Sequence, residues 1–499
     1  MTSTEGDDTG AGSDLSHLSN ADLAPVPPSA RTWSLWHVAA LWIGMAVCIP
    51  TYMIAAGMVS QGMTWWEATL TVLAGNVIVA IPMILNAHAG TKYGIPFPVI
   101  VRASFGISGA HIPSIARALV ACGWFGIQTW IGGSAAYMAL AAMGVVNAAA
   151  DTNVLPFLGI TATQLACFLA VWLLHVVIVV RGIDSIRRLE AWAAPCLIVL
   201  GLALLGWAVM SVPRASDLFA APTRSPDFDF WAVFFPQLTA MVGFWATLSL
   251  NIPDFSRYCA SQRDQSLGQL LGLPPTMTLF CLIGVLVTNA TVILYGKAIW
   301  DPIELVGHFG SATATVIAMA ALILATVTTN LAANVVSPAN GFSNVSPRRI
   351  SFRTGALATC ALGIVIMPWK LLANLNDYIF TWLIGYSALL GPIAGIMLCD
   401  YFVIRRTRLD VHALYDQRGP CRGVRWSAIA ALVLAVLPCI PGFVNAATNS
   451  IGSPDARFGP IWDSIYSYAW FVGLALGAGF YWAFQRLGAP PETTRAPHP

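Results

Sequence analysis

An aromatic side chain and an amide lie one helical turn apart in the stretch from Cys122 to Trp130. Trp124 and Gln128 are four residues apart and therefore share one face of a helix. An amide offers both a donor and an acceptor, which complements the alternating C=O and N–H groups of a cyclic ureide or a pyrimidine. A glutamine that ties two helices together would produce the same spacing. The pattern is compatible with a site for a planar amide and with a purely structural pair.

The stretch from Ala325 to Asn334 concentrates hydroxyl and amide side chains inside an apolar segment. Asn330 and Asn334 share a helical face, and Thr328 and Thr329 place two adjacent hydroxyls nearby. Hard cations such as Na⁺ prefer oxygen ligands, which hydroxyls supply without burying a full charge. The alternative is that each threonine donates to the carbonyl four residues earlier. Two threonines and two asparagines in one apolar segment favour a binding role.

A further aromatic pair, Phe244 and Trp245, follows Gly243. A second tryptophan can close on the opposite face of a flat ring held by Trp124, because aromatic rings stack on planar ligands. Most of the 19 tryptophans, however, are expected in the core or in the aromatic belts at the membrane interface. Trp245 and Phe244 are therefore candidate substrate contacts only in combination with the other polar stretches.

No catalytic constellation accompanies these residues. The sequence has no HExxH, GxSxG or Walker motif and no pair of carboxylates inside an apolar block. The ten cysteines include no CxxC pair and lie mostly in apolar blocks, as small core residues do. His37 and His175 lie within the predicted spans, and for both a hydrogen-bonded structural role is expected, with a proton-coupling role as the alternative. We expect neither an enzyme nor a bound cofactor, and a site that is polar but uncharged.

The composition indicates that a membrane must surround these stretches. Of 499 residues 57% are hydrophobic and only 10% are charged, against about 25% in ordinary soluble domains. The mean hydropathy is +0.70, and the apolar residues come in blocks of roughly 20, enough to cross about 30 Å of hydrocarbon. These values exclude a soluble enzyme, and a net charge of +2 with scattered arginines argues against a nucleic-acid partner.

Twelve apolar blocks are predicted to be transmembrane helices. They begin near residues 33, 67, 113, 159, 189, 232, 271, 312, 354, 373, 426 and 462. With both termini cytoplasmic, all but five of the 25 Lys and Arg residues fall on the cytoplasmic side, as the positive-inside rule requires. Residues 1–30 are expected to be a disordered cytoplasmic tail, 403–425 a cytoplasmic loop and 487–499 a second tail. The expected location is the cell inner (plasma) membrane.

The first and sixth spans share a short pattern. Residues 49–52 and 252–255 both join Ile-Pro to a polar residue and an aromatic one. Five spans separate the starts of the two copies, so the two units would enter the membrane from opposite sides. We therefore expect an inverted repeat of five plus five helices over 31–215 and 228–402, with two additional helices in 426–486.

Helix-breaking residues lie within both of these spans. Gly44 and Pro50 in the first span and Gly243 in the sixth are positions where a transmembrane helix can unwind. Unwound backbone at membrane depth persists only where it faces protein or a water-filled cavity. Paired interrupted helices in two inverted halves are typical of secondary transporters, with the site at the break.

Eight short segments form a combined signature over nearly the whole chain. They cover residues 20–23, 31–33, 86–98, 102–106, 124–128, 251–255, 332–339 and 391–402. Together they resemble the nucleobase-cation-symport-1 family of purine, pyrimidine, allantoin and hydantoin permeases. The resemblance implies the leucine-transporter type of fold, all-α with the inverted repeat described above, and transport by alternating access.

The resemblance also implies individual site residues. Trp124 and Trp245 match the two stacking tryptophans of the family, and Gln128 and Asn334 match its substrate-binding amides. The cation site of its sodium-coupled members combines carbonyls of the broken first helix with oxygens of the eighth. The matching atoms here are the carbonyls of Gly44, Val47 and Ala325 and the hydroxyls of Thr328 and Thr329.

One position departs from the family pattern. Cys48 stands where other members place Gln or Asn, so one substrate hydrogen bond is expected to be missing or weak, because a thiol is a poor donor. The gate residues of the tenth span fall near Ile379 and Phe380. Cys48, Phe244 and Ile379 complete the expected substrate contacts.

The sequence thus predicts a cation symporter that imports a small planar cyclic amide. Allantoin or a related ureide or hydantoin is the first expectation, and uracil, cytosine or a purine is the alternative. The coupling ion is expected to be Na⁺, with H⁺ as the alternative. A non-transporting sensor with the same fold is the third possibility. The expected partners are the substrate, the cation and the lipid bilayer.

Overall fold

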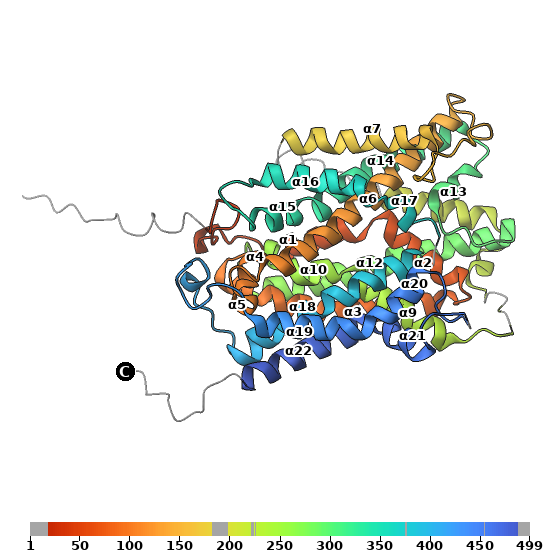
Figure 1. Cartoon of the computed structure of the whole chain (residues 1–499). Helices are drawn as coiled ribbons and strands as arrows, with labels where there is room; N and C mark the ends of the chain where they lie inside the picture. Colours follow the sequence, from red (N-terminus) through yellow and green to blue (C-terminus); the bar gives the residue numbers. More distant parts are fainter. Residues whose placement is uncertain are drawn as a thin grey trace, which may run out of the picture.

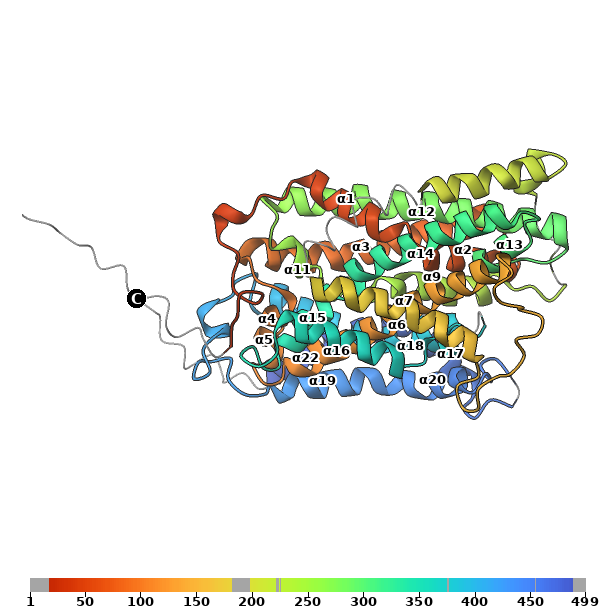
Figure 2. The same cartoon turned by 90° about the horizontal axis from the view of Figure 1, so that it is seen from above.

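The computed structural model describes residues 18–181, 198–220, 224, 226–374, 377–453 and 455–487. The outermost parts of the two predicted tails and the predicted start of the fifth span near residue 189 lie outside the described residues. Within the described part the chain is helical apart from two isolated bridges. Its long helices lie side by side along one common direction, as Figures 1 and 2 show from two sides.

Helices occupy the chain segments that the apolar blocks predict. Six are long and apolar enough to cross a membrane, namely α3 (Trp65–Tyr93), α7 (Ala162–Arg181), α12 (Gln262–Tyr295), α14 with α15 (Ala312–Asn334, Val336–Ser343), η4 with α18 and η5 (Asp377–Ile384, Gly385–Leu398, Cys399–Ile404) and α19 with η7 and α20 (Trp426–Val436, Leu437–Cys439, Ile440–Ala447). The pair α1 (Leu35–Ala46) and α2 (Ile49–Ser60) forms a seventh, bent span.

Other helices fill the remaining predicted segments. They are α6 (His111–Ala142), α9 to α11 (Phe230–Phe244, Ala246–Asn251, Pro253–Ser256), α16 (Phe352–Val365), α22 (Ala469–Leu487) and an apolar helix at Ile198–Ser211. Short helices α4 (Phe97–Ile100), α5 (Arg102–Phe105), α13 (Pro302–Gly307), α17 (Pro368–Leu371) and α21 (Pro460–Ser467) lie in the connections.

The first span is broken between Gly44 and Pro50, as the sequence predicts. The axes of α1 and α2 differ in direction by 60°, and Cys48 between them is extended at φ −145° and ψ 161°. In a continuous helix the Cys48 N–H would bond to the Gly44 carbonyl. It bonds to the Ala46 carbonyl instead, at 3.1 Å. The break therefore frees the Gly44 carbonyl for another partner.

The sixth span is interrupted at Trp245, two residues beyond the predicted position. Helix α9 ends at Phe244, and Trp245 has φ −102° and ψ 6° before α10 begins. Gly243 serves close packing instead, because a Cβ atom there would lie 2.2 Å from Ser387 Oγ. The glycine lets α9 approach α18, and the interruption falls just after that contact.

The helices pack in two groups that meet around the interrupted segments. Helices α1, α2 and α3 pack on α12, while α6 packs on α7, α14 and α16. Helix α10 contacts α3, α6 and α18, and α18 packs on α22. The broken sixth span therefore lies between the groups.

Part of the segment predicted as a disordered tail packs against the helices. Leu23 is fully buried, Arg257 Nη1 donates to the Asp22 carbonyl, and Arg102 Nη2 donates to the Leu18 carbonyl. The predicted boundary of the tail at residue 30 stays a prediction, but residues 18–30 have defined places on the bundle.

Candidate functional site

Trp124 lies in a group of aromatic rings from three other helical segments. Its ring centroid is 5.0 Å from that of Phe244 on α9, 6.3 Å from Tyr378 and 6.0 Å from Trp382 on η4, and 6.4 Å from Tyr386 on α18. All four neighbours meet the indole at steep angles, from 62° to 90°. No aromatic ring of the described residues therefore stacks parallel on this indole.

Tyr386 joins this aromatic group to the interrupted sixth span. Its hydroxyl accepts a hydrogen bond from Trp124 Nε1 at 3.3 Å and donates one to the Gly243 carbonyl at 2.8 Å. The side chain is 6% exposed. One hydroxyl thus fixes the indole of α6 relative to the end of α9.

The structure does not bring Trp124 and Trp245 face to face. Phe244 contacts both indoles, with its centroid 5.0 Å from each. Trp245 Nε1 donates to Asn76 Oδ1 at 3.0 Å, and the Trp245 ring meets Trp42 edge-on at 5.2 Å. The two tryptophans predicted to hold a substrate ring are separated here by the phenyl group of Phe244.

Asn334 is the end of a buried hydrogen-bond chain. Its Nδ2 donates to Asn330 Oδ1 at 2.9 Å. Asn330 Nδ2 lies among three acceptors: the Phe125 carbonyl at 3.0 Å, Thr129 Oγ1 at 3.2 Å and His175 Nε2 at 3.1 Å. An amide nitrogen, with its two hydrogens, belongs in that position, so the orientation of the Asn330 amide is determined.

The orientation of Asn334 follows from that of Asn330. One N–H of Asn334 is used on Asn330 Oδ1, which leaves its own Oδ1 and its second N–H for another partner. His175 Nδ1 is held by the Val171 carbonyl at 2.8 Å, so its Nε2 is the acceptor. His175 is thus buried and hydrogen-bonded at both ring nitrogens.

Gln128 supplies a second buried acceptor. The side chain is 5% exposed, and its Oε1 has no hydrogen-bond partner among the described residues. Gln128 lies one turn from Trp124 on α6, which packs along α14. An unsatisfied buried carbonyl oxygen costs free energy unless a ligand or water completes it. Gln128 is therefore suited to accept from a ligand N–H.

The predicted cation ligands of the eighth span lie together. Thr328 Oγ1 lies 2.9 Å from the Ala325 carbonyl and 3.1 Å from the Leu324 carbonyl. The contact with Leu324, four residues earlier, is the back-bonding that is the alternative to a binding role for this threonine. Thr329 Oγ1 is buried without a hydrogen-bond partner among the described residues. The freed carbonyl of Gly44 and the neighbouring Val47 belong to the break beside α1, which contacts α14. No cluster of three His, Cys, Asp or Glu side chains that could hold a metal ion occurs in the described chain.

The remaining predicted contacts are buried in the same core. Cys48, 4% exposed, lies with its Sγ 3.2 Å from Thr51 Oγ1, and Ile379 is fully buried. In the tenth span, however, the side chains that contact Trp124 are those of Tyr378, Trp382 and Tyr386. We had not assigned them to the site, although their four-residue spacing predicts a single aromatic face on a helix.

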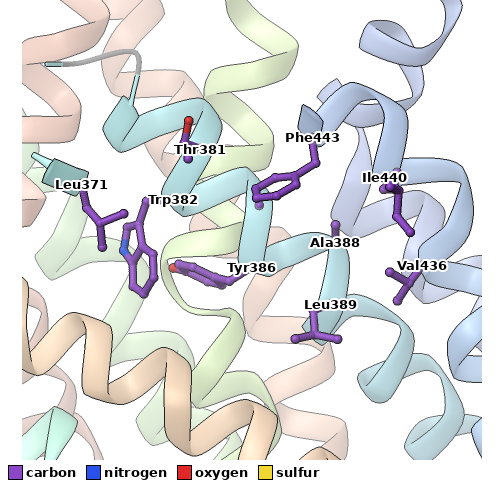
Figure 3. A pocket seen from close by; sticks show the side chains of 11 residues that line it. Leu371, Thr381, Trp382, Tyr386, Ala388, Leu389, Val436, Ile440 and Phe443 are labelled. Carbon is purple, nitrogen blue, oxygen red and sulfur yellow. The ribbon is translucent and has the colours of Figure 1, made fainter. Parts of the chain in front are cut away.

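An apolar cavity of about 360 Å³ lies behind this aromatic face. Figure 3 shows Trp382 and Tyr386 on one side of it and Phe443 of α20 with Ile440 on the other. None of the predicted substrate or cation ligands lines this cavity. It is a neighbour of the candidate site and not the site itself.

Comparison with known proteins agrees with this architecture. Residues 25–473 match the family model described as permease for cytosine/purines, uracil, thiamine, allantoin. The chain is 44% identical over 478 residues to the purine-uracil permease of Arabidopsis thaliana, covering 94% of this chain and 78% of that permease. It is 36% identical over 481 residues to the allantoin permease of Bacillus subtilis (strain 168), covering 95% of this chain and 94% of that one.

A solved structure has the same fold. Mhp1, a nucleobase-cation-symport-1 family transporter in a closed conformation with bromovinylhydantoin bound, superposes with a TM-score of 0.75 at 26% identity, covering 94% of this chain and 96% of that chain. A Na⁺-coupled sialic acid symporter, with a TM-score of 0.58 at 13% identity over 93% of this chain and 92% of its own, shares the fold alone. The leucine-transporter type of fold is thereby confirmed, and the protein is a transporter and not an enzyme. The chain belongs to the nucleobase-cation-symport-1 family of permeases.

Proposed function

We propose that this permease is a cation symporter that imports a planar cyclic amide, with allantoin or a related ureide or hydantoin as the first candidate. In this proposal the ring lies against the face of Trp124, and Gln128 and Asn334 bind its edge. Phe244 turns aside when the ring enters between Trp124 and Trp245. Without substrate, the phenyl group of Phe244 lies between the two indoles, where the substrate ring would bind.

The observation that carries the proposal is the unpartnered acceptor of Gln128, one turn from Trp124 on the helix α6 that packs along α14, the helix of Asn334. Gln128 presents an unpartnered acceptor, and Asn334 presents an acceptor and one N–H because Asn330 uses its other N–H. A ring with adjacent N–H and C=O groups completes both amides without any charge. Hydantoin, allantoin and uracil all have such an edge. Cys48 and Ile379, buried nearby in the same core, would limit the space for ring substituents.

We further propose that Na⁺ binds between α1 and α14. The ligands would be the carbonyls of Gly44, Val47 and Ala325 and the hydroxyls of Thr328 and Thr329. The freed Gly44 carbonyl and the unpartnered Thr329 hydroxyl support this assignment. A cation that holds the two helices together favours one conformer and thereby raises substrate affinity, which is coupling by linkage. Coupling to H⁺ is the alternative, and the Na⁺ dependence of uptake decides between them.

The test is radiolabelled allantoin uptake into cells that express the chain, with and without Na⁺. Competition by hydantoin, uracil, cytosine, hypoxanthine and urate identifies the ring class. We expect Trp124→Ala to abolish uptake while surface expression is retained. Trp130→Ala is the matched control, because Trp130 lies on the same helix but packs on Phe168 and Trp369. Retained uptake in Trp124→Ala would refute the site.

Uracil or a purine is the second candidate substrate. The specific observation in its favour is the 44% identity to a relative named a purine-uracil permease. Uracil uptake that allantoin does not displace would select this candidate. Specific binding without accumulation would indicate a sensor.

The proposed orientation places both termini on the cytoplasmic side of the cell inner (plasma) membrane. It rests on the distribution of Lys and Arg residues. Accessibility of tags at the two termini from outside the cell would contradict it.

A further inference from the structure

A polar recess of about 410 Å³ lies where α6 begins, at His111. Figure 1 labels the short helices α4 and α5, which precede α6 in the chain. The volume of the recess is within the range of small-molecule pockets. Four separate stretches of the chain line it, namely Leu18, residues within 107–111, residues 344–348 and residues within 417–423. None of the proposed substrate or cation ligands is among the lining residues.

The side chains around this recess are donors and cations. Arg348, Arg422 and His111 line it together with Asn344 and Gln417. No Asp or Glu is among the described residues that line it. A recess with several donors and no acid selects an anion.

Arg102 fixes the orientation of the Asn344 amide. Arg102 Nη2 donates to Asn344 Oδ1 at 2.6 Å, so the amide nitrogen points away from Arg102. Asn344 is 2% exposed, and its Nδ2 has no partner among the described residues. His111 Nδ1 is likewise buried without a partner in the described chain. Two residues that line the recess thus each have a buried polar atom without a hydrogen-bond partner among the described residues.

Arg102 supplies a buried positive charge directly behind Asn344. The residue is 1% exposed, and its other hydrogen bonds go to the carbonyls of Leu18 and Leu414, each at 3.0 Å. No ion pair joins it to a carboxylate among the described residues. Burial lowers the pKa of Arg102 only to about 10, so it is charged at neutral pH. A buried charge without a counter-ion is destabilising.

We propose that this recess binds a phosphate group, either that of a free phosphate compound or that of an anionic phospholipid head group. Phosphate oxygens are acceptors only, and they point in several directions. That suits side-chain donors from three separate stretches of chain, at His111, at Asn344 and Arg348 and at Gln417 and Arg422, better than a planar carboxylate does. The bound group would be the counter-ion that Arg102 lacks.

Binding would connect parts of the molecule that are distant in sequence. The start of α6 and the loop after α15 would share one ligand with the 417–423 loop and the segment at Leu18. Phosphate binding can be measured without transport. The result therefore does not depend on which substrate the permease transports.

The first experiment measures the thermal stability of the purified full chain in phosphatidylcholine nanodiscs against inorganic phosphate, at constant ionic strength balanced with chloride. We expect a saturable rise in Tm, as for any ligand of the folded state. Arg422→Gln should raise the phosphate concentration at half-maximal shift by about three- to tenfold. Arg422 is exposed, so this variant should fold.

Arg263→Gln is the matched control, because Arg263 is an exposed arginine outside the recess. It should leave the phosphate response unchanged. The absence of a phosphate-specific shift in the wild-type chain, or an equal shift in Arg422→Gln, would overturn the proposal.

The source of the phosphate group is identified by repeating the titration in nanodiscs with phosphatidylglycerol. A higher starting Tm and loss of the phosphate response would identify a lipid head group as the ligand. An unchanged response would identify a free phosphate compound. Both results support the recess as a phosphate site.

Discussion

Methylation of the substrate ring nitrogen that faces Gln128 should weaken binding to the wild-type chain. The same methyl group should cost little affinity when Gln128 is replaced. Its Oε1 is buried without a partner in the described chain, so a ligand N–H that reaches it completes a missing hydrogen bond. A methyl group at that nitrogen leaves the acceptor unsatisfied, which costs about 1–3 kcal/mol. The expected loss of affinity is therefore about 5- to 150-fold.

The assay is inhibition of radiolabelled allantoin uptake by hydantoin and by its 1-methyl and 3-methyl derivatives. It is carried out on the wild-type chain and on Gln128→Leu, which removes the acceptor. For the nitrogen that faces Gln128, the methyl penalty should shrink to less than about threefold in the variant, as in a double-mutant cycle. The other methyl penalty should stay the same in both proteins.

Thr326→Val is the matched control for this cycle. Thr326 Oγ1 is also buried without a partner among the described residues, but Thr326 is not a proposed ligand. The control should keep the wild-type methyl penalties. If Gln128→Leu also keeps both of them, Gln128 accepts no substrate N–H and the reasoning is refuted.

Tyr386→Phe leaves the Trp124 N–H and the Gly243 carbonyl without their common partner, so the KM of uptake should rise about 5- to 30-fold; an unchanged KM at equal expression would contradict this. Thr329→Val removes a proposed cation ligand at constant shape, and the Na⁺ concentration for half-maximal uptake should rise at least about tenfold; unchanged Na⁺ dependence would place the cation elsewhere. Burial raises the pKa of Asp301, the N-cap of α13, to about 6. The folded chain then holds this proton more tightly than the unfolded chain, so stability falls as pH rises from about 4 to about 6. Asp301→Asn keeps the N-cap but cannot titrate, so its Tm in detergent should fall less between about pH 4 and about pH 6 than that of the wild-type chain. An equal fall of Tm in both proteins would refute the assignment.

The helices were predictable because their signal is local. Hydrophobic blocks of membrane-crossing length mark α3 and α12, and short-range backbone chemistry places the break between α1 and α2. Pro50 has no N–H to donate, and Gly44 lowers the cost of leaving the helix. The interruption of the sixth span was predicted less well, since it falls at Trp245 and Gly243 serves a contact with α18.

The candidate site was predictable in part. The polar residues of α6 and α14 stand out against apolar surroundings, so Gln128 and Asn334 could be selected from spacing and from the family resemblance. The spacing of these residues does not show which of their amide atoms are free to bind a ligand. Only the contacts of Asn330 determine which atoms of Asn334 remain available, because three acceptors from other parts of the fold surround the Asn330 nitrogen.

By itself the sequence determined the class of protein and the positions of most helices. It also marked the polar residues inside apolar spans, which stand out because hydrocarbon disfavours polar groups. These follow from hydrophobicity, helical period and backbone chemistry, which act over a few neighbouring residues. The tertiary structure alone decided which rings surround Trp124, that Phe244 separates it from Trp245, and that Arg102 is buried without a carboxylate partner among the described residues. Such contacts join residues hundreds of positions apart, and they depend on how whole helices pack.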